Sequence, residues 1–271
     1  MAEPAKHPVD HEANADALEL AMSQRLDAAV SLRRKDGKPF PTKQQLDDLI
    51  PTRTFRRGSG TLFVIPRTNK APDEDLSGRT VKRLTPMSKA PTFREFFEKR
   101  FAPGAHLLQS AALAKRKGCP EETILGCLLH DLGNYIMRCD HGYWAAQMIE
   151  PYVSEKVAFA VRYHQALRFF PDPETNYEYP IAYYQTFGID YVPAPHIVEA
   201  YKYVVKHPWY EHARLVTTND LYAFDPNAKV EYDEFEDIVG RHFKQPTEGL
   251  GNDNSPVAHM WRSLANPDAP L

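Results

Sequence analysis

The chain has 271 residues, of which 42% are hydrophobic and 25% charged, a balance typical of a globular protein that buries a large core. Its formal net charge of −3 argues against nucleic-acid binding by bulk electrostatic attraction. We expect no membrane contact, since there is no apolar run of about 18 residues, and no signal peptide. The three cysteines form no CxxC pair, so we interpret them as reduced thiols in a cytoplasmic protein.

Residues 1–90 predict an extension that wraps or caps a main domain, or a partly disordered tail. Helical spacing occurs at residues 15–32 and 42–50, and residues 61–68 could form a short strand. The stretch that follows, at residues 70–80, has the composition of a loop.

From Thr92 onward, helical spacing dominates. Helices are predicted over residues 92–101, 103–118, 120–133, 141–152 and 154–170, and one or two more over residues 194–224, broken at Pro208. Residues 171–180 read as a loop, and strand signals are almost absent. The fold class is therefore mainly α: a helical bundle at residues 91–245, between the extension and a C-terminal tail at residues 246–271.

Several polar side chains fall on apolar helical faces. His130 and Asp131 follow directly on Leu128 and Leu129 at the end of an apolar run. An unpaired carboxylate in such surroundings costs several kcal/mol, which suggests that a cation lies nearby.

Two further positions extend this pattern. His164 continues the apolar series of Val153 and Val157, and Asp220 continues that of Ala213 and Val216. His106 and His141 open two helices, which completes a set of four histidines and two aspartates: His106, His130, Asp131, His141, His164 and Asp220.

Each of these residues also has an ordinary structural interpretation. A single inward histidine is usually a hydrogen-bonded core residue, Asp220 could cap a helix, and His141 could lie at the surface. The adjacent His130–Asp131 pair shifts the balance, because neighbouring helical residues point about 100° apart and can reach one ion. Imidazole and carboxylate together suit iron, manganese or zinc better than calcium or magnesium. Six ligands match two ions that share a carboxylate.

The order His, His-Asp, His, His, Asp resembles the HD-domain superfamily. Within it, residues 106–135, 141–149, 161–170 and 207–225 are similar to the mixed-valent diiron oxygenases, a group that includes myo-inositol oxygenase and phosphonate-cleaving enzymes. The resemblance covers roughly residues 92–240.

The resemblance implies a bundle of about five core helices that holds an Fe(II)/Fe(III) pair and uses O2. Asp131 would bridge the ions, with His106, His130 and Asp220 at one and His141 and His164 at the other. Such enzymes remove hydrogen from a substrate C–H bond, after which a C–C or C–P bond can break.

The resemblance also points to substrate contacts. Arg168 matches a substrate-anchoring lysine of the phosphonate-cleaving branch; otherwise it forms a surface salt bridge. Asn134 stands where many two-metal phosphohydrolases, and myo-inositol oxygenase, carry lysine. Tyr184 and Gln185, in a tyrosine-rich stretch, either line a substrate pocket or serve loop packing.

Two alternatives to a diiron oxygenase remain open at this point. One is a metal-dependent phosphohydrolase of the same superfamily, which Asn134 disfavours. The other is a non-catalytic HD-like scaffold, which the complete set of six ligands disfavours. The expected partner is a small-molecule substrate, and the sequence does not indicate an oligomeric state.

Overall fold

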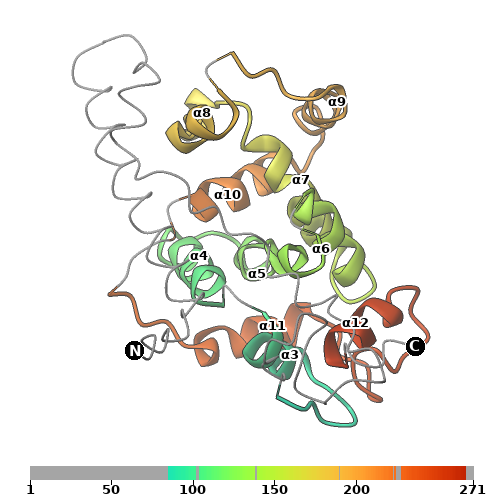
Figure 1. Cartoon of the computed structure of the whole chain (residues 1–271). Coiled ribbons are helices and arrows are strands. Elements are labelled where there is room, and N and C mark those ends of the chain that lie inside the picture. The colour runs from blue at the N-terminus through green and yellow to red at the C-terminus, as the bar shows by residue number, and fades with distance from the viewer. Residues whose placement is uncertain are drawn as a thin grey trace, which may run out of the picture.

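The computed structural model describes residues 85–101, 104–137, 139–188, 190–221, 223 and 227–266 (Figure 1). The helices and strand expected before residue 85 lie outside these residues. In the described part every regular element is helical, which confirms the mainly α class. None of these helices has the length and apolar character to cross a membrane. The elements are α3 (Phe93–Arg100), α4 (Gly104–Arg116), α5 (Glu121–Leu129), η2 (Leu132–Tyr135), α6 (His141–Ile149), α7 (Glu155–Leu167), η3 (Pro173–Thr175), α8 (Ile181–Phe187), α9 (Pro195–Val204), α10 (Tyr210–Leu221), η4 (Tyr232–Phe235), α11 (Glu236–His242) and α12 (Ala258–Ala265).

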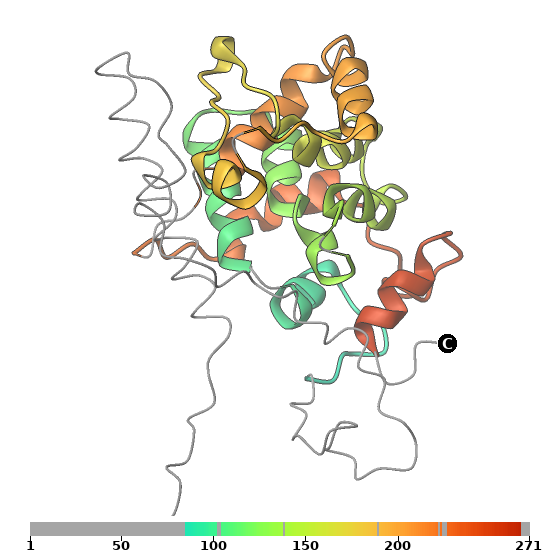
Figure 2. The same ribbon diagram turned by 45° about the horizontal axis from the view of Figure 1, so that its top comes forward.

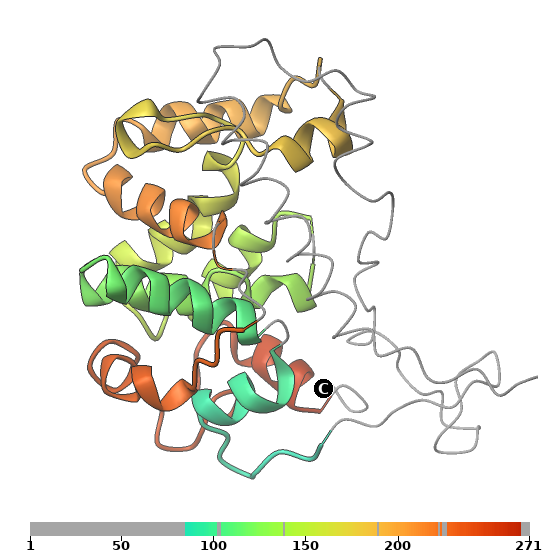
Figure 3. The same ribbon diagram turned by 90° about the vertical axis from the view of Figure 1, so that its left-hand side faces the viewer.

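The helix α5 lies at the centre of the bundle. It packs against α4, α7 and α10, while α6 packs on α7 and η2. All residues from Thr123 to Leu129 are buried, as expected for a helix that is apolar all round. Figure 3 shows the layers: α8 and α9 at one end, the bundle in the middle, and α3, α11 and α12 at the other end.

Helix boundaries follow from local capping chemistry. The side chain of Thr92 accepts a hydrogen bond from the backbone N–H of Glu95 at 3.1 Å, which caps α3. Gly118, with φ 69°, ends the α4 region. The break predicted at Pro208 is confirmed, because α9 ends at Val204 and α10 begins at Tyr210.

Two segments are more ordered than the sequence indicated. The tyrosine-rich stretch contains the helix α8. The segment after residue 245, expected as a tail, contains α12, whose Trp261 is fully buried. The ring of Trp261 packs edge-on against Phe96 at 4.8 Å, and its Nε1 donates to the carbonyl of Met148 at 3.0 Å. Figure 2 shows α12 beside the body of the bundle.

Trp261→Phe should therefore destabilise the fold. The variant leaves the Met148 carbonyl without its buried donor and loses ring volume, so we expect the free energy of unfolding to fall by about 1–3 kcal/mol. Urea unfolding followed by circular dichroism measures this. The matched control is Trp144→Phe at a half-buried position on α6, where the loss should be clearly smaller; equal losses would contradict the packing role of α12.

A buried histidine outside the candidate site makes stability depend on pH. His212 is buried, and Thr123 Oγ1 lies 3.0 Å from its Nδ1. Burial, together with repulsion from Lys156, lowers its pKa to about 4.

Because its folded pKa lies below the unfolded value of about 6.5, His212 favours the folded state fully above pH 6.5. That contribution is lost as pH falls toward 4, where the unfolded chain binds the extra proton. Between pH 7 and pH 5 we expect the unfolding free energy to fall by about 2 kcal/mol more in the wild type than in His212→Gln. Parallel urea titrations at the two pH values test this, and identical slopes for both proteins would disprove it.

Candidate metal centre

The six histidine and aspartate side chains singled out from the sequence converge in the middle of the bundle. They come from α4, the end of α5, α6, α7 and α10, helices that lie side by side in Figure 1. All six are buried, with at most 8% of any residue exposed. His141 and His164, which could have pointed to solvent, are among them.

One group of three lies around His106. Its Nε2 is 3.2 Å from His130 Nε2 and 3.1 Å from Asp220 Oδ1. His130 Nε2 is in turn 3.4 Å from the same oxygen. Two imidazoles and one carboxylate therefore direct their polar atoms at one point.

A second group lies around His141. Its Nε2 is 3.1 Å from His164 Nε2 and 3.0 Å from Asp131 Oδ1. Asp131 also faces the first group, with Oδ1 3.6 Å from His130 Nε2 and Oδ2 3.9 Å from His106 Nε2. This carboxylate therefore lies between the two groups, where a bridging ligand would have to lie.

Backbone carbonyls fix the orientation of three of the imidazoles. The Nδ1 of His130 donates to the carbonyl of Cys127 at 2.7 Å, and that of His164 to Val161 at 2.6 Å. The Nδ1 of His106 faces the carbonyl of Ala223 at 3.3 Å. In the neutral ring each Nε2 then presents a lone pair, the tautomer that metal-binding histidines adopt.

The protonation states also suit cation binding. Burial alone would raise the pKa of Asp131, but the imidazoles of His130 and His141 outweigh it and hold the pKa well below its usual value. Arg168 and His130 do the same for the pKa of Asp220 against its burial. Burial lowers the pKa of His164 to about 4, so this ring is neutral at pH 7. The centre thus combines anionic carboxylates with at least one neutral imidazole.

These residues fit a pair of metal ions. Three sets of three side chains each place their donor atoms within 4.8 Å of one another: His106, His130 and Asp131; His130, His164 and Asp220; and Asp131, His141 and His164. Asp131 Oδ1 is buried and receives no hydrogen bond of regular geometry from the described residues. Neutral nitrogens about 3 Å apart match the spacing of neighbouring ligands on an ion with metal–nitrogen bonds of about 2 Å. The donor set suits iron, manganese or zinc.

Glycines let the ligand-bearing segments approach closely. A Cβ on Gly133 would lie 2.1 Å from the carbonyl oxygen of His141, and one on Gly142 would lie 2.9 Å from the carbonyl oxygen of Val161. Only glycine fits at these contacts. The motif residues around His130 and His141 therefore allow η2, α6 and α7 to pack tightly enough to bring their imidazoles together.

Arg168 lies beside the centre and forms a buried ion pair. Its Nη1 is 3.1 Å from Asp220 Oδ2, and its side chain is 18% exposed. The two carboxylate oxygens of Asp220 thus face different partners: Oδ1 faces the imidazoles and Oδ2 faces the guanidinium. The Nε of Arg168 is buried and has no hydrogen-bond partner among the described residues.

The other three expected substrate contacts lie in two elements, Asn134 in η2 and Tyr184 and Gln185 in α8. Asn134 is half-buried in η2, and its backbone N–H donates to the carbonyl of Asp131 at 3.0 Å. Tyr184 packs against Tyr179 at 4.6 Å. Gln185 belongs to α8, and its side chain lies outside the described part. The sequence interpretation missed Tyr183, whose ring lies 5.2 Å from the Arg168 guanidinium; its position in the tyrosine-rich stretch was the available signal.

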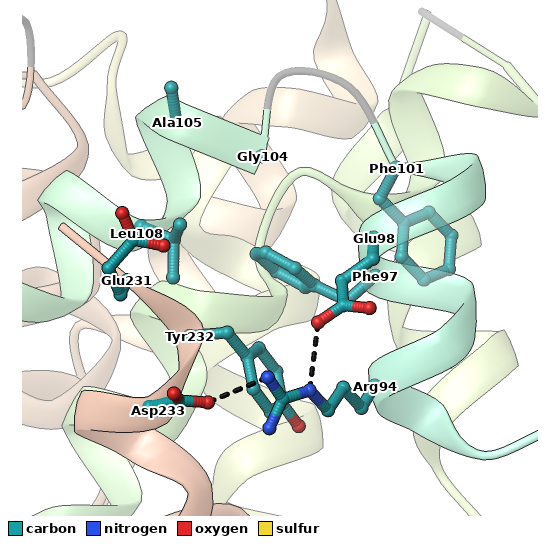
Figure 4. Close-up of a pocket in the computed structure, with 10 residues that line it drawn as sticks. All are labelled: Arg94, Phe97, Glu98, Phe101, Gly104, Ala105, Leu108, Glu231, Tyr232 and Asp233. Atoms are coloured by element: carbon teal, nitrogen blue, oxygen red, sulfur yellow. Dashed lines mark hydrogen bonds and ion pairs between the residues drawn. The ribbon is translucent and has the colours of Figure 1, made fainter. Parts of the chain in front are cut away.

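A surface pocket of about 390 Å³ lies elsewhere, between α3, the start of α4 and η4. Figure 4 shows its aromatic wall, Phe97, Phe101 and Tyr232, and the ion pairs of Arg94 with Glu98 and Asp233. None of the six converging side chains lines it. The pocket is therefore separate from the candidate metal centre.

Comparison with known proteins gives limited similarity. No protein-family model matches the chain. Over 74 residues the chain is 32% identical to a [1-hydroxy-2-(trimethylamino)ethyl]phosphonate dioxygenase (glycine-betaine-forming) from Leisingera caerulea. The aligned stretch covers 23% of this chain and 38% of that relative. The chain is thus similar, over a short stretch, to an oxygenase that acts on a phosphonate.

Proposed function

We propose that the protein is an O2-dependent oxygenase that holds two iron ions and oxidises a small organic anion. The observation that carries the proposal is the convergence of four imidazoles and two carboxylates, with Asp131 between two groups of ligands. The similarity to a phosphonate dioxygenase supports the use of O2 over other uses of such a centre.

The geometry supports one assignment of roles to these residues. His106, His130 and Asp220 would hold one ion, His141 and His164 the other, and Asp131 both. Once bound, the iron pair would supply the redox chemistry by which O2 removes hydrogen from a substrate C–H bond, leading to hydroxylation or to C–C or C–P cleavage. The buried position of the six ligands would keep bulk water away from that reaction.

Arg168 would bind the anionic group of the substrate. Its Nη1 is paired with Asp220 Oδ2, while its buried Nε has no hydrogen-bond partner in the part of the chain that the structure describes. A guanidinium with free N–H groups matches the oxygens of a phosphonate or carboxylate in bidentate geometry. Its place next to Asp220 would bring the substrate to the edge of the metal centre.

Arg168→Lys should separate this role from metal binding. Lysine keeps the positive charge near Asp220 but loses the planar fork, so we expect KM to rise about tenfold with iron content unchanged. Steady-state O2 consumption, with the hydroxyphosphonate named for the relative as the first substrate, measures KM. The matched control is Arg162→Lys on α7, where the guanidinium lies over the Tyr143 ring and KM should not change. An unaltered KM in Arg168→Lys would remove Arg168 from the substrate site.

The test of the function is spectroscopic and chemical. Protein purified without oxygen, loaded with Fe(II) and partly oxidised should contain about two irons per chain and give an S = 1/2 electron paramagnetic resonance signal from coupled Fe(II)/Fe(III). Addition of a hydroxyphosphonate should change that signal and start O2 uptake.

Three outcomes would contradict the proposal. Phosphate-ester hydrolysis without O2 uptake would indicate a phosphohydrolase. Zinc or magnesium as the sole native metal would point the same way. Absence of bound metal under all loading conditions would indicate a non-catalytic scaffold.

A further inference from the structure

The helix α8 covers the end of α7 beside the candidate metal centre. Aromatic rings of α8 contact the side chains at this end of α7. The Tyr183 ring lies 5.2 Å from the guanidinium of Arg168 and 5.2 Å from the Phe169 ring. The Phe187 ring lies 5.6 Å from Phe169. In Figures 1 and 3, α8 lies in the outer layer of the molecule, beyond α10. Ring contacts of this kind are individually weak, and they carry no directional hydrogen bond.

The segment just before α8 is held by hydrogen bonds. Asp172 and Tyr177 exchange two backbone hydrogen bonds, at 2.8 and 2.9 Å. The Tyr177 hydroxyl donates to the carbonyl of Arg168 at 2.9 Å, and that of Tyr210 donates to Asp172 Oδ2 at 2.7 Å. Residues 172–177 therefore form a fixed base, from which α8 extends.

At the C-terminal end of α8 the backbone has a conformation that only glycine adopts readily. Gly188, the residue after the helix, has φ 93° and ψ 161°, a region almost closed to other residues. A Cβ there would meet no atom within 4 Å. Glycine is therefore favoured at this position by its backbone torsion angles and not by lack of space. Pro180 precedes the helix and Gly188 follows it. The backbone torsion angles of these two residues set the direction of the chain at the two ends of α8.

Arg168 offers a reason for α8 to move. The buried Nε of Arg168 has no partner among the described residues, and Tyr183 covers the face of the guanidinium. An anion would meet the edge of the guanidinium, in the plane of its N–H groups. In the arrangement described, the tyrosine would enclose an anion bound there and shield it from water.

We propose that α8 is a substrate lid, which opens to admit a small organic anion to Arg168 and closes with Tyr183 stacked on the guanidinium. The lid rests on the proposed function, since it serves the same site. It names Tyr183 as a positioning residue and an organic phosphonate or carboxylate as the chemical class admitted. Closure would hold the anion in place while the C–H bond to be oxidised lies over the metal centre.

The experiment is hydrogen–deuterium exchange of the iron-loaded protein with and without methylphosphonate, with binding followed by calorimetry. In the wild type, saturating methylphosphonate should slow amide exchange in the peptide that spans residues 178–188 at least fivefold. Tyr183→Phe, which keeps the ring, should behave like the wild type. Tyr183→Ala should abolish the slowing and weaken methylphosphonate binding about tenfold.

The second variant acts on the backbone and leaves the site untouched. Gly188→Ala should disfavour the closed position and reduce the anion-dependent slowing about fivefold. Its matched control is Gly118→Ala, where φ is 69° and a Cβ again meets nothing within 4 Å, but the position follows α4; here the slowing should persist.

The outcomes separate the lid from the function. If methylphosphonate fails to bind, or binds without slowing exchange in residues 178–188, the lid is wrong even when iron and O2 uptake are demonstrated. If Tyr183→Ala and Gly188→Ala both keep the full slowing, the lid is also wrong. If the slowing follows Tyr183 and Gly188 while no iron is bound and no O2 is consumed, the lid stands and the oxygenase proposal fails.

Discussion

Under the proposed function, Asp131→Asn is expected to remove most of the bound iron and to lower O2 consumption by a factor of about 100 or more. Asp131 lies between the two groups of imidazoles, with Oδ1 3.0 Å from His141 Nε2 and 3.6 Å from His130 Nε2. Asparagine has the same shape but no charge, and its nitrogen donates where a ligand oxygen is needed. Both ions should therefore be affected, whereas loss of an outer ligand would affect chiefly one.

Three measurements check this expectation. Iron per chain is determined by a colorimetric assay, the S = 1/2 signal by electron paramagnetic resonance, and stabilisation by the increase in Tm on iron loading. A ligand at about 1,000 times its Kd adds about 4 kcal/mol to folding stability, so the wild type should show a clear increase and the variant little. The control is Asp190→Asn, at an exposed position. Retention of about two irons in Asp131→Asn would exclude a bridging role.

Gly133→Ala is expected to lower the free energy of unfolding by about 3 kcal/mol and to disturb the candidate metal centre. The added Cβ would lie 2.1 Å from the carbonyl oxygen of His141 and 2.7 Å from the backbone nitrogen of Ala145. Both are backbone atoms, so α6 must move away as a unit. Since His141 opens α6, its imidazole would leave the position opposite His164.

The matched control is Gly240→Ala in α11, where a Cβ meets no atom within 4 Å. In a helix this change should stabilise by about 0.5–1 kcal/mol. Urea unfolding gives both values, and iron content reports on the centre. Equal stability of the two variants, or full iron content in Gly133→Ala, would show that η2 and α6 can separate without cost to the site.

The helices and the six converging side chains could be predicted because one physical pattern encodes both. Apolar residues at helical spacing define the face of a helix that turns inward, and His164 and Asp220 continue that spacing on α7 and α10. The adjacent His130 and Asp131 mark the end of the most apolar helix of the bundle. Whether these six side chains bind metal stays a prediction.

Other features depend on contacts that no local pattern encodes. The helix α8 has seven residues, among them two tyrosines, a threonine and a phenylalanine, which favour helix only weakly. The rings of Tyr183 and Phe187 pack on Phe169, which follows the end of α7. The burial of Trp261 depends on Phe96, far away in sequence. The ion pair between Arg168 and Asp220 joins the C-terminal end of α7 to α10, and residues so far apart in the chain share no local pattern that predicts their contact.

The number of residues between the first and the last of the six candidate ligands bears on the lifetime of the protein in the cell. His106 and Asp220 stand 114 positions apart in the chain, and a cation held between them would act as a removable cross-link, closing a loop of more than a third of the molecule. Loss of that cross-link would widen the range of unfolded conformations and expose the chain to proteases. Under the proposed function, the abundance of the protein would rise and fall with iron supply, without any dedicated sensor.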